Sequence, residues 1–524
     1  MNIANHLADV VRRTPEHSAI LAPRITNGAL EEYTYAQLAS LVEGYANGFF
    51  AQGIKKGDKV LVLIPLSVDL YAVMIALFKI GATGVLYEPK EIRWQLNATL
   101  PSLEVNACIT SPRINMFLWS VRAYRNIPLR VLTHRSGVPR FGATIISIEN
   151  TQPVPERDLP PDTPALITFT SGSEGTPKGI CRTHEFLNTQ HAILQNHMHL
   201  TSEDRILTSL PVFVLSMLAA GSFAIIPPLK KNLPWKPETE RTMKLIHDKH
   251  VTMFLGSSAF ITPLVQCAKE KGIRFETVKR AMVGGCFLEI ALIDLLRAVL
   301  APNATIEVIY GSTEVEPVAV ASIHDITQSA HYGYEGYCVG TPIPDVRARI
   351  VPFVKGNIAA MPKPLGIGEI GELIVSGKHV NERYTPQEPA WSMNKIVEGK
   401  NIWHRMGDGA YLDTEGRIWL VGRFKHLPDK ILHQYPEYLH LEGALKKQGL
   451  ARRVTVVQAH NGIKLIVENT ANIFTKRNMK KKIRELCAVH HIEPTDIIIK
   501  RQLPLDRRHN SKVDYGKVKA LVSG

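Results

Sequence analysis

The sequence predicts an α/β fold with a large N-terminal domain and a small basic C-terminal domain. Short apolar runs alternate with helix-like segments through the first 420 residues, a pattern typical of helices packed on largely parallel sheets. From about Glu369 onward, glycine-bounded turns separate short strand-like runs. Residues 424–524 hold 20 Lys and Arg against 9 Asp and Glu, a net charge of +11, whereas residues 1–423 carry +3. We therefore expect the N-terminal domain to span residues 1–423 and the C-terminal domain to span residues 424–524.

The individual elements of the larger domain follow from their periodicity. Short continuous apolar runs predict buried strands, and apolar residues that recur every three or four positions predict helices. The predicted strands are 59–64, 83–87, 166–169, 253–255 and 280–283. The predicted helices are 3–11, 70–79, 261–271 and 288–300.

The composition is that of a soluble globular protein, with 45% apolar and 21% charged residues. None of the six cysteines has a partner at Cys-X-X-Cys spacing, which argues against a zinc site or a disulfide framework and fits a reducing cytoplasm. The first 20 residues lack the apolar core of a secretory signal. The uncharged stretch 206–229 is long enough to cross a bilayer, but its three prolines favour a strand, a loop, a helix and a second strand. We expect a cytoplasmic protein without a transmembrane segment.

A glycine- and hydroxyl-rich loop after the predicted strand 166–169 is the strongest indication of chemistry. It runs Thr-Ser-Gly-Ser-Glu-Gly-Thr-Pro-Lys-Gly over residues 170–179. Glycines let backbone N–H groups approach phosphate oxygens, hydroxyls add donors, and a lysine adds a positive charge. The loop lacks the Gly-Lys-Ser/Thr ending of a Walker A motif. The candidate phosphate-binding residues are Thr170, Ser171, Gly172, Ser173, Gly175 and Lys178.

This loop resembles the signature of the adenylate-forming superfamily, which includes acyl-CoA synthetases, adenylation domains of peptide synthetases and firefly luciferase. Glu174 stands where that family usually has Thr, so Lys178, Arg182 or magnesium must balance its charge. Four more segments resemble the family's motifs in the family's order. These segments are 283–288, 310–314, 403–423 and 503–512.

The resemblance implies roles for residues of these motifs. A glycine pair borders the adenine, a tyrosine stacks on it, and an Asp and an Arg hold the ribose hydroxyls. The nucleotide-binding residues implied in this way are Gly284, Gly285, Tyr310, Gly311, Asp408 and Arg423. Thr313 contacts the α-phosphate, and Glu314 binds Mg²⁺, for which Thr170 offers a hydroxyl ligand. Lys512 bridges the α-phosphate and the carboxylate of the substrate.

The reaction implied by the resemblance is the activation of a carboxylic acid. The acid attacks the α-phosphorus of ATP, an acyl-adenylate forms, and pyrophosphate leaves. The protein positions two anions and screens their repulsion, with ATP and Mg²⁺ as cofactors. The resemblance also implies a β-barrel-like subdomain within the N-terminal domain, and a small mobile α+β C-terminal domain that carries Lys512.

Within this superfamily, three segments resemble the olefin β-lactone synthetases. They are 336–344, 403–408 and 508–512. In that group the substrate is a β-hydroxy fatty acid, and its own hydroxyl attacks the adenylated carbonyl to give a β-lactone and AMP. The resemblance places the acyl pocket near His184, Phe213, Gly256 and Ser257, although lone His and Phe residues are more often part of a core.

Two other functions stay open at this stage. One is a fatty acyl-CoA ligase or an acyl-carrier-protein ligase, for which the basic tail would suit an acidic carrier. Against it, no glycine stands between Arg423 and Gly443, where thioester-forming relatives have a glycine-bearing loop that lines the pantetheine channel. The other is a nucleic-acid-binding protein that uses residues 424–524. That region contains no basic motif interleaved with aromatic residues, so we expect no nucleic acid partner.

Overall fold

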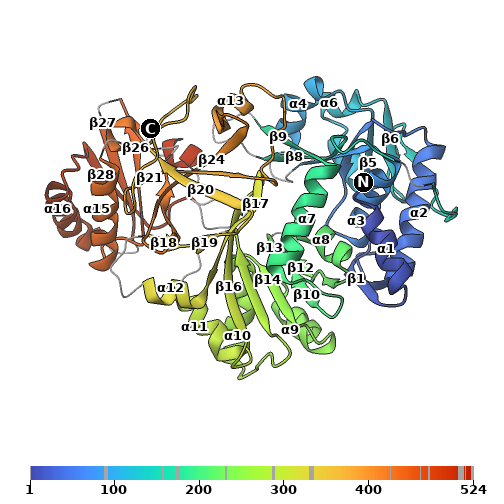
Figure 1. Cartoon of the computed structure of the whole chain (residues 1–524), viewed down its shortest axis with the longest axis horizontal. Coiled ribbons are helices and arrows are strands. Elements are labelled where there is room, and N and C mark those ends of the chain that lie inside the picture. Colours follow the sequence, from blue (N-terminus) through green and yellow to red (C-terminus); the bar gives the residue numbers. More distant parts are fainter. Residues whose placement is uncertain are drawn as a thin grey trace.

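The structure is a computed structural model of the 524-residue chain. It describes residues 2–87, 92–155, 158–170, 177–230, 233–285, 290–329, 336–424, 427–432, 434–460, 462–469, 473–504, 513 and 515–520. The expected α/β class is confirmed, with two large sheets and three smaller ones among the described residues. In Figure 1 the N-terminal strands and helices lie at the upper right and the C-terminal ones at the left.

The first large sheet has eight strands, and its central strands run parallel. In spatial order the strands are β22 (Tyr384–Thr385), β9 (Lys178–Thr183), β8 (Pro164–Thr170), β4 (Thr83–Tyr87), β3 (Lys59–Leu63), β5 (Ala107–Thr110), β6 (Leu129–Leu132) and β7 (Thr144–Ile145). The hairpin of β8 and β9 is antiparallel and pairs Thr170 with Lys178. The strand pairing therefore brings the two ends of the predicted phosphate loop together.

The second large sheet has nine strands. In spatial order they are β19 (Thr341–Pro342), β17 (Val315–Ser322), β16 (Thr305–Ser312), β15 (Arg280–Gly284), β14 (Met253–Gly256), β10 (Arg205–Thr208), β11 (Phe223–Ile225), β1 (Ser18–Pro23) and β2 (Leu30–Thr34). A separate ribbon pairs β12 (Leu229–Lys230) with β13 (Leu233–Pro237). Strands β11, β10, β14, β15 and β16 are parallel, so their carboxyl ends share one edge.

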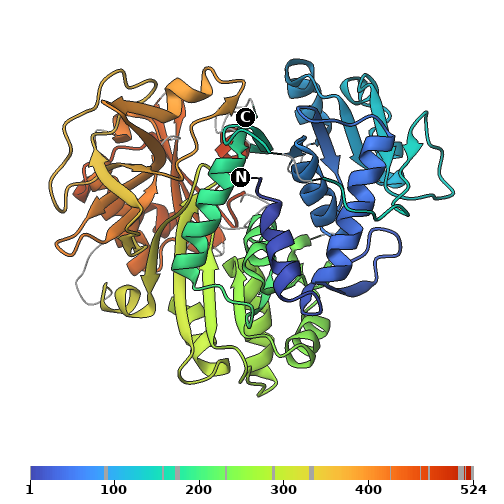
Figure 2. The same ribbon diagram turned by 45° about the vertical axis from the view of Figure 1, so that its right-hand side comes forward.

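Helices fill the space between the two large sheets and cover their outer faces. The inner layer contains α1 (Asn5–Arg13), α2 (Tyr35–Ala51), α3 (Val68–Ile80), α7 (His184–Met198) and α8 (Pro211–Ala220). The outer face of the eight-stranded sheet carries α4 (Ile92–Leu103), α5 (Pro112–Leu118) and α6 (Arg122–Arg125). The outer face of the nine-stranded sheet carries α9 (Thr239–Asp248), α10 (Ser258–Glu270) and α11 (Ile290–Val299). In Figure 2 helix α7 lies between the blue N-terminal elements at the right and the yellow and orange strands at the left.

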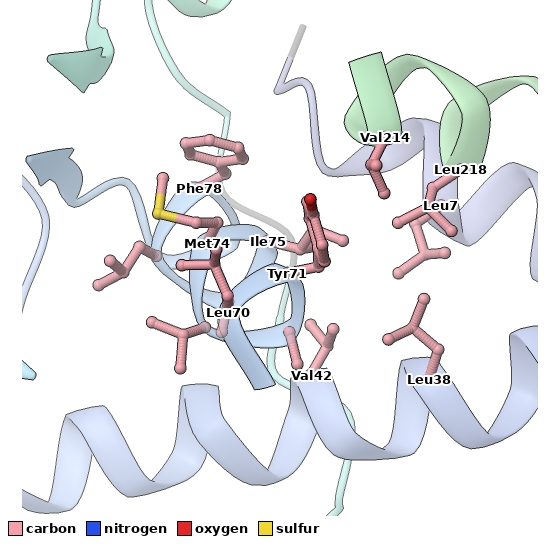
Figure 3. Packing of buried hydrophobic residues seen from close by; sticks show 14 of the residues in the cluster. Leu7, Leu38, Val42, Leu70, Tyr71, Met74, Ile75, Phe78, Val214 and Leu218 are labelled. Carbon is pink, nitrogen blue, oxygen red and sulfur yellow. The ribbon is translucent and has the colours of Figure 1, made fainter. Parts of the chain in front are cut away.

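Helix α3 lies at the centre of this inner layer. Apart from Asp69 in its first turn and Lys79 in its last, its residues are apolar on every side, as expected of a helix enclosed by other elements. Figure 3 shows five of them packed against α1, α2 and α8; the labelled residues are Leu7, Leu38, Val42, Leu70, Tyr71, Met74, Ile75, Phe78, Val214 and Leu218. The uncharged stretch 206–229 folds as β10, α8 and β11, so the strand–helix–strand prediction is confirmed. No helix in the described part of the chain is both long and apolar enough to cross a membrane.

A third sheet forms the expected barrel-like subdomain. Its path is β18 (Tyr337–Cys338), β25 (Ile418–Arg423), β24 (Asn401–Leu412), β21 (Gly371–Gly377) and β20 (Val346–Val351), with β23 (Lys395–Glu398) paired to β24. Within the described residues the pairing is antiparallel, and it does not close into a ring. Two short helices flank this region, α12 (Ile323–Ser329) and α13 (Ala390–Asn394).

The C-terminal region is α+β, as expected. It contains the strands β26 (Arg453–Ala459), β27 (Gly462–Glu468) and β28 (Asp496–Lys500). Its helices are α14 (Asp429–Leu432), α15 (Tyr435–Lys447), α16 (Ile473–Val489) and α17 (Tyr515–Ala520). A boundary at residue 423 stays a prediction, because one apolar cluster joins Trp419 of β25 to Phe424 and Tyr435.

Two glycines allow the start of α15 to contact the third sheet. A Cβ atom at Gly409 would lie 2.9 Å from the Tyr435 ring, and one at Gly422 would lie 2.8 Å from its hydroxyl. Gly422 also has a φ of 144°, which other residues rarely adopt. The Tyr435 ring therefore rests directly on the backbones of β24 and β25.

Candidate active site

The candidate site lies where the hairpin β8–β9, the turn between β16 and β17, and strands β23–β25 meet. Lys178 begins β9, and Thr313 and Glu314 occupy the turn after β16. Asp408 pairs with Arg423 in the register of β24 and β25. Residues separated by up to about 245 positions in the sequence are therefore brought to one place by strand pairing.

A buried ion pair links the phosphate loop to the second large sheet. The Nζ atom of Lys178 lies 2.6 Å from Oε1 of Glu314. Burial alone would raise the pKa of Glu314, but nearby basic groups, Lys178 first among them, hold this pKa well below its usual range. His404 and Lys395 act in the same direction. Glu314 is therefore an anion with a cationic partner at its Oε1 atom.

Arg182 holds the turn that carries this pair. Its side chain is buried, and Nη2 donates to the carbonyl oxygen of Thr313 at 2.7 Å. Nη1 donates to the hydroxyl oxygen of Thr168 at 3.2 Å. From the other side, the backbone N–H of Asn381 donates to the Glu314 carbonyl at 2.7 Å. The backbone at residues 313–314 is thus held from two sides, by Arg182 and by Asn381.

A second cluster of polar side chains, formed by Tyr310, Asp408 and Arg423, is centred on the Asp408 carboxylate. The Tyr310 hydroxyl donates to Oδ2 at 2.7 Å, and Nε of Arg423 lies 3.0 Å from Oδ1. The carboxylate of Asp408 raises the pKa of Arg423. Burial and the same carboxylate raise the pKa of Tyr310 well above its usual range. Each oxygen of Asp408 keeps lone-pair capacity beyond the bond it accepts, which is the chemistry needed to accept hydrogen bonds from the two hydroxyls of a ribose.

Local packing or backbone conformation explains why three of the predicted site residues are glycines. A Cβ at Gly284 would lie 2.8 Å from the side chain of Ile309 on the neighbouring strand, and one at Gly311 would lie 2.8 Å from the carbonyl of Val315. Gly285 has a φ of 76°. Close strand approach at Gly284 and Gly311, and a left-handed turn at Gly285, therefore require glycine whether or not adenine lies beside them.

Several predicted residues lie outside the described part of the chain. They are Ser171, Gly172, Ser173, Gly175 and Lys512. Thr170 is described as the last residue of β8. For these residues, as for the rest of the predicted site, the assigned roles stay predictions.

Three of the four residues predicted for the acyl pocket lie at the carboxyl-end edge of the nine-stranded sheet. Gly256 ends β14, buried Ser257 directly precedes α10, and buried Phe213 stands in the first turn of α8, after β10. Ligands of open α/β sheets bind at such edges. His184 has different surroundings: its Nδ1 accepts a hydrogen bond from the backbone N–H of Ile3 at 3.3 Å, and its ring contacts Phe78 of α3. Burial lowers the pKa of His184 to about 4, so the ring is neutral.

No sequence motif predicted Lys395 and His404 as neighbours of Glu314. His404 lies within the segment 403–408, three positions before Gly407, and Lys395 lies in none of the motifs. The one available indication was a lysine at the start of a short apolar run, Lys395-Ile-Val, where a charged side chain is unusual. Burial lowers the pKa of Lys395 to about 7, although Glu314 opposes this shift.

The chain is similar to known proteins in sequence and in fold. A family model described as AMP-binding enzyme matches residues 7–385. An olefin beta-lactone synthetase of Xanthomonas campestris is 30% identical over 81% of this chain and 79% of its own length. A second one, of Stenotrophomonas maltophilia, is 28% identical over 80% and 79%. The solved structure of an amide bond synthetase from Marinactinospora thermotolerans shares the fold, with a TM-score of 0.73 over 99% of this chain and 100% of that chain at 17% identity.

Proposed function

Since the chain belongs to the family of AMP-binding enzymes and is an adenylate-forming acid ligase, we propose that it activates a β-hydroxy fatty acid with ATP and closes the acyl-adenylate to a β-lactone. The observation that supports the first step is the convergence of the Lys178–Glu314 ion pair with the Tyr310–Asp408–Arg423 group. One end of this site presents a cation and an ionised carboxylate, and the other presents hydrogen-bonding groups suited to a nucleoside.

The chain's own residues account for the positioning of both anions. Asp408 and Arg423 hold the ribose, and Lys178 exchanges Glu314 for a phosphate oxygen. Glu314 is a buried, ionised carboxylate, the type of oxygen ligand that Mg²⁺ takes together with phosphate oxygens. Bound Mg²⁺ would supply charge that screens the phosphates from the incoming carboxylate. Thr313 contacts the α-phosphate, and Lys512 bridges it to the carboxylate of the acid.

For the second step, the substrate's own hydroxyl replaces an external thiol. Its oxygen bonds to the adenylated carbonyl carbon, the bond from that carbon to the phosphate oxygen breaks, AMP leaves, and the hydroxyl proton passes to solvent. Two curated relatives are named olefin beta-lactone synthetases. In addition, α15 begins at Tyr435, in the region where thioester-forming relatives have a glycine-bearing loop. These observations favour the lactone over a CoA or carrier-protein thioester, and no observation favours the nucleic acid function.

The second step is tested by product analysis. Purified enzyme with ATP, Mg²⁺ and a β-hydroxy fatty acid should yield a product lighter than the acid by one water, together with AMP, in the absence of any thiol. The matched control is the same fatty acid without the hydroxyl, which should give adenylate but no lactone. Mass spectrometry with and without CoA distinguishes the outcomes. Product that forms only with CoA, as a thioester, would replace the lactone proposal with an acyl-CoA ligase.

The ribose assignment gives a second prediction. In the Asp408→Asn variant the side chain no longer carries the charge that attracts the ribose hydroxyls and Arg423. We expect kcat/KM for ATP to fall about 10- to 100-fold, the range for losing hydrogen bonds to a charged group. The variant should also lose the wild-type preference for ATP over 2′-deoxy-ATP and 3′-deoxy-ATP. Equal loss with ATP and with both deoxy nucleotides would contradict a contact between Asp408 and the ribose.

A further inference from the structure

Lys395 stands at the start of β23, where its backbone pairs with His404 of β24. Its side chain is only 1% exposed. Within the described part of the chain, its Nζ atom has no hydrogen-bond partner. Nζ lies 5.6 Å from the centroid of the Tyr384 ring, and Nζ of Lys178 lies at the same distance from the same ring. Two ammonium groups therefore share one aromatic neighbour, and only one of them has a hydrogen-bonded carboxylate.

The charges around Lys395 place it in the phosphate end of the site. The groups that act on it are Glu314 and Glu382, which attract it, and Lys178, which repels it. The groups that act on Arg423, by contrast, are Asp408, Tyr310 and Glu314. Glu314 thus acts on both sets of residues, the lysines at the phosphate end and Arg423 at the ribose end. Lys395 belongs to the phosphate end, together with Lys178.

Lys395 differs from the other cations at this end of the site, because among the described residues its Nζ atom has no hydrogen-bonded partner. Glu314 is bonded to Lys178, and the buried guanidinium of Arg182 is bonded to backbone and hydroxyl oxygens. The protonated form of Lys395 carries a positive charge that no hydrogen bond from the described residues compensates. A buried charge without a partner is unfavourable for folding, and such a cost is typical of functional sites, where the missing partner is a ligand. The complementary ligand is an anion.

We propose that Lys395 is a second anion-binding lysine of this site, which binds an oxygen of the pyrophosphate end of ATP. The inference rests on the proposed function, because it requires the nucleotide to bind beside Lys178. As Lys178 turns from Glu314 to a phosphate, the opening of that ion pair gives the polyphosphate access to Lys395. The second lysine then contacts the β- or γ-phosphate, whereas AMP, which lacks both, does not reach it.

The test measures binding rather than turnover. Isothermal titration with ATP, pyrophosphate and AMP is carried out on the wild type and on Lys395→Met, which keeps the side-chain length and removes the charge. We expect about tenfold weaker binding of ATP and of pyrophosphate, as for the loss of one charged hydrogen bond, and less than a twofold change for AMP. The matched control is Lys400→Met, an exposed lysine five positions further along, which should bind all three ligands like the wild type.

Thermal unfolding of the ligand-free variants separates a binding lysine from a structural one. The melting temperature of Lys395→Met should equal or exceed that of the wild type, because the substitution removes an unpartnered buried charge. A lower melting temperature with weaker binding of all three ligands would identify Lys395 as structural and overturn the proposal. Unchanged affinities, or equal losses for AMP and ATP, would also overturn it. Failure of the wild type to bind ATP would instead refute the proposed function itself.

Discussion

A Lys512→Ala variant is expected to release pyrophosphate in response to the acid about 10²- to 10³-fold more slowly than the wild-type enzyme, the usual effect of removing one group that stabilises charge in the transition state. The physical reason is that two anions, a carboxylate and the α-phosphate, must come within bonding distance. A lysine between them screens their repulsion at the moment of reaction. ATP binding, measured by titration without the acid, should change little, because the triphosphate keeps its other contacts.

The control for this variant is Lys517→Ala. Lys517 is an exposed residue of α17, five positions after Lys512, so it reports the effect of removing one positive charge from the same basic region. Its pyrophosphate release should stay within about twofold of the wild type, as expected for a surface charge. A near-normal rate for Lys512→Ala, or equal losses in the two variants, would remove Lys512 from the reaction and leave only the general charge of residues 424–524.

A Glu314→Gln variant is expected to lose at least about 10²-fold in kcat/KM, because the neutral amide cannot hold Mg²⁺ as a carboxylate does. The apparent Mg²⁺ concentration for half-maximal rate should rise as well, which a Mg²⁺ titration of pyrophosphate release would measure. The variant should also be less stable by about 1–3 kcal/mol, since Lys178 and Lys395 lose the carboxylate that neutralises them in the buried site.

The effects of Glu314 on stability and on activity can be separated by a double variant. Lys178→Met combined with Glu314→Gln removes both charges of the ion pair and should recover part of the lost stability, measured as the free energy of unfolding in urea, but none of the activity. Glu307→Gln, near the start of β16, the strand that precedes the turn with Glu314, is the single-site control and should have a wild-type Mg²⁺ dependence. A Glu314→Gln variant with a normal Mg²⁺ dependence would exclude this residue as a metal ligand.

The ion pair of Lys178 and Glu314, at 2.6 Å, has two consequences for the proposed mechanism. It stabilises the protein, because each side chain neutralises the other. Under the proposed function, a triphosphate takes the place of the Glu314 carboxylate beside Lys178 and leaves that carboxylate to bind a metal ion, so the nucleotide must supply enough binding energy to open the ion pair.

The sequence alone determined the fold class, the strand–helix–strand order of residues 206–229, and the motifs of an adenylate-forming enzyme. These properties depend on local patterns: periodicity separates strands from helices, and phosphate chemistry restricts which residues a loop can contain. Only the tertiary structure decided that Lys178 pairs with Glu314, and that His184 bonds to the backbone of Ile3 and packs against α3. It also decided that Lys395 is buried near both charges, with no hydrogen bond from the described residues. Such contacts join residues far apart in the chain, and they depend on strand register and on the packing of separate layers, which no short segment of sequence specifies.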